Sequence, residues 1–178
     1  MKLTLDLPAI DFDDTAFLSI ITEMPAYALV DDLNHLYDLS LHRTDDLLLD
    51  DLGPLPLYRY HNPLRHLRYW LTETHGDTSA YLLIVQGGES AEVAQAISDD
   101  FNGPDQPPHP ADLPAVRRYD ILSRYRCQFT VVSVVDFTSA DIDAASRKKL
   151  PARASAHVLR ADLFARILDY IDLNRLDE

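Results

Sequence analysis

Hydrophobic and polar residues alternate in KLTLDL (2–7) and LSLHRT (39–44), a period of two that is typical of half-buried β-strands. Three more strands are predicted further along the chain, at 55–61, 67–74 and 80–86. The last two of these are joined by a short, turn-rich loop, which indicates an antiparallel meander. The valine-rich latter half of 117–137 is typical of a buried strand.

Apolar residues recur every three or four positions elsewhere, which predicts amphipathic helices. In the helix expected after Pro25, Asp31 and Asp32 should face water, and the apolar face should consist of Tyr27, Val30, Leu33, Leu36 and Tyr37. Further helices are predicted at 89–101, 139–150 and 155–176. The stretch 102–114 is rich in proline and should be a loop.

These elements predict an α+β fold, in which an antiparallel sheet of about five to six strands is packed by an N-terminal and a C-terminal helix. A length of 178 residues favours a single domain, 1–178, with an insertion or linker at 87–112. The apolar runs are shorter than the roughly 20 residues that span a membrane. The one cysteine, Cys127, is consistent with a cytoplasmic protein, in which this residue has a structural role.

Charge is distributed unevenly in this acidic chain, whose net charge is −13. Such a field argues against nucleic-acid binding. Two basic islands interrupt it, at 58–70 and 113–127. We expect their side chains to form a binding surface made of Arg59, His61, Arg65, Arg68, Trp70, Arg117 and Arg118.

The first island reads as a β-hairpin whose turn begins at Asn62 and Pro63. The expected register places Tyr60 opposite Leu67, Tyr58 opposite Tyr69 and Arg59 opposite Arg68. Two arginines in direct opposition repel each other. We therefore expect an acidic group between them, supplied either by the chain itself or by a partner.

A short motif, IDFDDT at 10–15, matches the D-x-D-x-T pattern of haloacid-dehalogenase-like phosphatases. In that chemistry Asp11 would attack phosphorus and Asp13 would act as acid and base beside a magnesium ion. The preceding stretch is interrupted by Asp6 and Pro8, and no acidic metal-binding strand end follows Lys148 and Lys149. The histidines lack the spacing of metal ligands, so we predict neither a metal site nor a cofactor.

Several segments resemble the bacterial IPExxxVDY family, a set of small proteins named for a motif and not for an activity. Tyr27, Leu29, Leu33 and Asn34 fit its Y-x-L-x-x-x-L-N helix. The L-x-L-x-R-x-D-D-L segment that follows is matched by Leu39, Leu41, Arg43, Asp45, Asp46 and Leu47. The naming motif fits only at Leu113, Pro114 and Asp120. The resemblance implies a common fold and brings no activity with it.

The sequence thus favours a non-enzymatic module that docks an acidic protein partner or a second copy of itself. A magnesium-dependent phosphatase that uses Asp11 and Asp13 is one alternative. Binding of a small anion between the two basic islands is another, because the forked donors of arginine suit phosphate and carboxylate.

Overall fold

The computed structural model describes residues 14–49, 53–74, 80–103 and 106–130, together with Arg147, Arg166 and Ile167. The chain divides into two compact units, Asp14–Val131 and a second formed by Met1–Asp13 with Val132–Glu178. The first unit contains all the described strands and helices except two helical residues, Arg166 and Ile167. Several predicted features lie outside the described residues: the strand at 2–7, the motif aspartates Asp11 and Asp13, and the loop at 75–79. The same holds for the helix at 139–150 apart from Arg147, and for the helix at 155–176 apart from Arg166 and Ile167.

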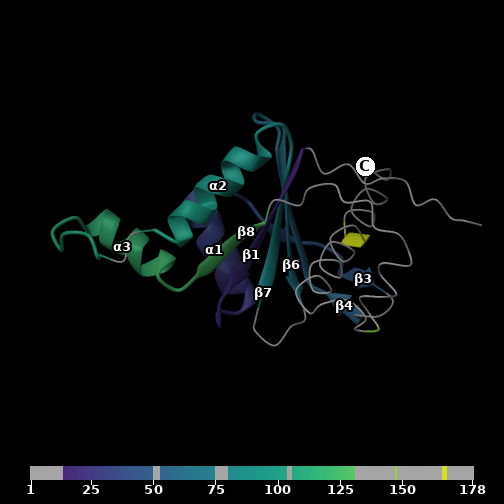
Figure 1. Cartoon of the computed structure of the whole chain (residues 1–178), viewed down its shortest axis with the longest axis horizontal. Helices are drawn as coiled ribbons and strands as arrows, with labels where there is room; N and C mark the ends of the chain where they lie inside the picture. Colours follow the sequence, from purple (N-terminus) through teal and green to yellow (C-terminus); the bar gives the residue numbers. More distant parts are fainter. Residues whose placement is uncertain are drawn as a thin grey trace, which may run out of the picture. The chain divides into compact units, whose positions relative to one another are not determined.

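A six-stranded antiparallel sheet is the centre of the first unit (Figure 1). Its strand order is β2-β5-β6-β7-β1-β8, so the N-terminal strand of the unit lies between β7 and β8. The strands are β1 (Thr15–Ile21), β2 (His42–Arg43), β5 (Leu57–Asn62), β6 (Leu67–Thr74), β7 (Ala80–Gln86) and β8 (Arg126–Thr130). A separate two-stranded sheet consists of β3 (Leu47–Leu49) and β4 (Gly53–Leu55).

Two helices, α1 (Ala26–Tyr37) and α2 (Ser90–Phe101), lie on one face of the sheet (Figure 1). Alternate residues of the central strands point toward these helices, as the period of two requires. The resulting core includes Leu18, Leu29, Leu33, Leu71, Leu83, Ile97 and Phe101. A sheet with helices gathered on one face confirms the predicted α+β class.

Helix α1 begins after Pro25 as predicted, but its buried face is turned relative to the prediction. Tyr27 is 74% exposed, and Leu29 occupies the core in its place with no exposed surface. Asp31 faces water, whereas Asp32 is buried, so the prediction for Asp32 was wrong.

The buried Asp32 carboxylate contacts Arg124 and Tyr125, two residues near the C-terminal end of the unit Asp14–Val131. The Tyr125 hydroxyl donates a hydrogen bond to Asp32 Oδ2, and Arg124 Nη1 lies 3.6 Å from the same oxygen. A buried carboxylate is tolerated when it is hydrogen-bonded and paired in this way. This contact therefore joins α1 to the residues that lead into β8.

The β5–β6 hairpin forms where expected, but its register differs from the prediction by two residues. Tyr60 pairs with Tyr69, and Arg59 pairs with Trp70. The reason is a four-residue connection, 63–66, in which Asn62 Oδ1 accepts hydrogen bonds from two following backbone N–H groups and His66 adopts a φ of 52°. A shift of two keeps each side chain on its face. It removes the direct opposition of the two arginines.

A third helix, α3 (Leu113–Leu122), was not predicted, and its first two residues, Leu113 and Pro114, had been assigned to the loop at 102–114. It begins at Asp112, whose Oδ1 accepts a hydrogen bond from the Ala115 N–H at 3.2 Å, with Pro114 in the first turn. The region 87–112 contains α2, whose Ala94 and Phe101 lie in the core. Helix α2 is thus part of the fold, while the prediction of a single domain with an insertion or linker at 87–112 stays a prediction.

Cys127 is a buried thiol on β8, and burial raises its pKa to about 11. We expect the folded protein to react with an aromatic disulfide reagent far more slowly than the unfolded chain does. At pH 8 the raised pKa alone lowers the thiolate fraction roughly 100-fold, and burial restricts access as well. The release of the coloured thiol, followed with and without denaturant, measures this; equal rates would contradict the buried placement.

Candidate functional site

The two basic islands do not meet at one surface. Arg59 and His61 on β5 lie on the same face of the sheet as Arg68 on β6, as their register shows. This face points away from α1 and α2. Arg117 and Arg118 lie on α3, which contacts the helical layer. A single anion held by both islands therefore has no geometric support among these residues.

The hairpin island is also less available than its sequence suggested. Trp70 is 7% exposed, so it contributes to the interior and not to a docking surface. Arg65, in the turn, donates two hydrogen bonds to Glu89 Oε2, at 3.1 Å from Nε and 2.5 Å from Nη2. An acidic residue of the chain itself thus neutralises this arginine.

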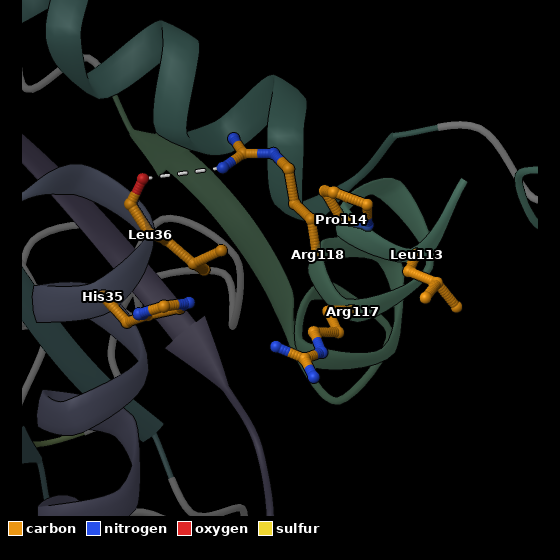
Figure 2. Close-up of a pocket in the computed structure, with 6 residues that line it drawn as sticks. All are labelled: His35, Leu36, Leu113, Pro114, Arg117 and Arg118. Carbon is orange, nitrogen blue, oxygen red and sulfur yellow. Dashed lines mark hydrogen bonds between the residues drawn. The ribbon is translucent and has the colours of Figure 1, made fainter.

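A pocket of about 500 Å³ lies between α1 and α3 (Figure 2). Its lining combines basic and apolar side chains: His35, Leu36, Leu113, Pro114, Arg117 and Arg118. No carboxylate, hydroxyl or thiol lines it, so the pocket offers hydrogen-bond donors and apolar surface and lacks a nucleophile. These groups suit binding of an anion and not covalent catalysis.

Arg118 holds the helical wall of this pocket in place. Its Nη2 lies 2.5 Å from Asp100 Oδ2 on α2, and its Nη1 donates to the Leu36 backbone oxygen on α1 at 3.5 Å. The guanidinium also lies 5.8 Å from the centre of the Tyr37 ring, within range of a cation–π interaction. One side chain therefore connects α3 to both neighbouring helices.

The carboxylate that receives Arg118 also affects a neighbouring phenol. The Tyr37 hydroxyl donates to Asp100 Oδ2 at 3.2 Å. Burial, followed by the negative charge of Asp100, raises the pKa of Tyr37 far above its usual value. Tyr37 therefore stays protonated and remains a donor throughout the neutral range, which keeps this junction of three helices intact.

Arg117 and His35 are the available donors of the pocket. Neither has a hydrogen bond or ion pair with any residue that the structure describes, and both are exposed. Figure 2 shows the His35 imidazole extending from α1 toward α3 and the Arg117 guanidinium extending from α3 toward α1. The two side chains thus approach the same space from opposite walls.

Leu113 gives the mouth of the pocket an apolar rim. This side chain is 66% exposed and begins α3, one helical turn before Arg117. Sequence reasoning found Arg117 and Arg118 but missed His35 and Leu113. The usable signal was Asp112 followed by Pro114, a helix start that would have placed Leu113 and Arg117 on one side of a helix.

The geometry defines this unit as an antiparallel α+β domain with a basic, partly apolar pocket between two helices. Neither the models of known protein families nor the curated proteins match this chain. Within the described part of the chain, no helix combines the length and apolar character that crossing a bilayer requires. The same residues contain no group of three side chains suited to hold a metal ion.

Proposed function

We propose that the protein is a non-enzymatic interaction module whose α1–α3 pocket binds an acidic protein partner. The observation that carries this proposal is the pair Arg117 and His35, two exposed donors without partners among the described residues of a strongly acidic chain. Other arginines of this unit have acidic neighbours, as Arg43, Arg65 and Arg118 do. Unpaired donors that face one another across a pocket favour an external anion.

Replacing Arg117 with glutamine is the first test of this proposal. We expect it to weaken binding of a capped, glutamate-rich ten-residue peptide on the order of tenfold, because a hydrogen bond to a charged group contributes about 1.5 to 3 kcal/mol. Fluorescence anisotropy of the labelled peptide measures the affinity. Raising the salt concentration should weaken binding to the unmodified protein, since ions screen exposed charges.

Arg43→Gln is the matched control, because it makes the same change of charge on the exposed strand β2, where Arg43 pairs with Asp46. We expect it to leave the peptide affinity within about twofold. Size-exclusion chromatography at low and high salt shows whether a second copy of the chain is the partner. A monomer at every salt concentration that also fails to bind the peptide would refute the proposal.

We also propose membership of the IPExxxVDY family, and with it a bacterial and cytoplasmic origin. The residues that carry the resemblance have structural roles in the fold, which supports this proposal. Leu29 and Leu33 are buried, and the Asn34 side chain exchanges two hydrogen bonds with the Leu41 backbone, at 2.8 and 3.1 Å. Such residues preserve a fold, which agrees with a family that shares structure without a shared activity.

A further inference from the structure

The spacing of two side chains on α3 limits what the pocket can recognise. Leu113 and Arg117 are four residues apart in the helix, so their Cα atoms lie on the same side of α3, about 6 Å apart along its axis. One presents exposed apolar surface, and the other presents forked donors. A ligand that contacts both must carry an apolar group and an anionic group at a similar separation.

An extended peptide meets this requirement through alternate residues. Side chains two positions apart in an extended chain point to the same side, at a separation of roughly 6.6 Å. Adjacent residues point to opposite sides, so an acidic residue directly followed by an aliphatic one cannot present both groups to α3 together. The geometry of α3 therefore selects one spacing over another.

Arg118 is the weaker candidate for the anionic group, because two of its five N–H groups donate to Asp100 and to the Leu36 backbone oxygen, and Asp100 neutralises its charge. Successive helical residues are directed about 100° apart, so α3 can turn Arg118 toward α2 while Arg117 faces the mouth of the pocket. A carboxylate of the ligand would accept from Arg117, with His35 as the second donor on the opposite wall. The carboxylate would then lie between α1 and α3.

We propose that the pocket binds an extended segment in which an acidic residue and an aliphatic residue are separated by one residue. This inference rests on the proposed function and names the chemistry of its partner. The acidic side chain binds between Arg117 and His35, and the aliphatic side chain covers Leu113. Charge complementarity selects the first group, and the exposed apolar surface selects the second.

Capped nonapeptides of identical composition test the spacing. Gly-Ser-Gly-Glu-Ser-Leu-Gly-Ser-Gly and its reverse place the two residues at the proposed spacing, and Gly-Ser-Gly-Glu-Leu-Ser-Gly-Ser-Gly places them next to each other. We expect the better of the two spaced peptides to bind at least about fivefold more tightly than the adjacent one, as expected for partial burial of one leucine. Titration of the full chain, followed by the shifts of its backbone amide resonances, measures the three affinities.

Two leucine variants test whether the preference depends on the apolar contact at Leu113 or on the loss of any exposed leucine. Leu113→Ser should remove the preference for the spaced peptides, whereas Leu64→Ser should leave it unchanged. Leu64 is a suitable control because it is 92% exposed and lies in the β5–β6 turn. Circular dichroism of each variant verifies that it is folded, and a preference that survives Leu113→Ser in the folded protein would overturn the inference.

The outcomes distinguish the inference from the function on which it rests. Equal affinity for all three peptides, weakened alike by Arg117→Gln, would refute the spacing rule and leave binding of an acidic partner intact. Affinities that Arg117→Gln does not change would refute both. Inorganic phosphate, titrated separately, should bind more weakly than the spaced peptides; tighter binding of phosphate would overturn the inference and favour a small-anion site.

Discussion

Replacing Leu29 with alanine is expected to lower the free energy of unfolding by about 2 to 5 kcal/mol. The side chain has no exposed surface and packs in the core between α1 and the sheet. Its truncation removes apolar contacts and leaves a cavity that the surrounding strands can fill only partly. Urea denaturation followed by circular dichroism measures the loss.

Tyr27→Ala is the matched control, two residues earlier on the same helix. Because Tyr27 is 74% exposed, we expect its truncation to change the free energy of unfolding by less than about 0.5 kcal/mol. The apolar pattern alone had placed Tyr27 in the core. A larger loss for Tyr27→Ala than for Leu29→Ala would mean that α1 turns a different face toward the sheet.

Tyr125→Phe is expected to lower the free energy of unfolding by roughly 2 to 3 kcal/mol. The substitution keeps the ring, which lies 5.3 Å from the Phe101 ring between their centres, and removes only the donor to Asp32. Among the described residues, Arg124 is then the remaining partner of the buried Asp32. Chemical denaturation measures the loss, and Tyr27→Phe, which removes an exposed hydroxyl, should have almost no effect.

The pH dependence of stability gives a second measurement of the same contact. Burial, followed by the hydrogen bond to Asp32, raises the pKa of the Tyr125 phenol above its usual value of 10.0. The unfolded chain therefore loses this proton at a lower pH than the folded chain does. The resulting contribution to stability is present below about pH 10 and decreases as the pH rises above it. Tyr125→Phe should make the alkaline loss of stability less steep.

The strands and helices with a clear hydrophobic period could be predicted from the sequence. The bounds of β6 and β7 agree with the expected 67–74 and 80–86, α1 begins directly after Pro25 as expected, and α2 lies close to the predicted 89–101. Helix α3 was missed because its apolar residues form only a weak helical period, and those that contact the core, Ile121 and Leu122, are only partly buried. Only its first residues carried a signal, a capping aspartate followed by proline.

Two other errors arose from interactions that a local pattern does not contain. The hairpin register depends on the length of its turn, which the Asn62 side chain and the left-handed backbone of His66 determine together. The burial of Asp32 depends on Tyr125, a residue 93 positions away. The spacing of apolar residues along α1 gave no indication of such a distant partner, and so Asp32 was predicted to face water.

Strand β2 limits how other chains can approach its side of the sheet. This edge strand has two residues, His42 and Arg43, and the side chains of both are exposed. A short, charged edge offers few backbone groups to an incoming strand, which protects a sheet against edge-to-edge aggregation. On this side, recognition by addition of a strand is therefore disfavoured, and a partner must be distinguished by its side chains.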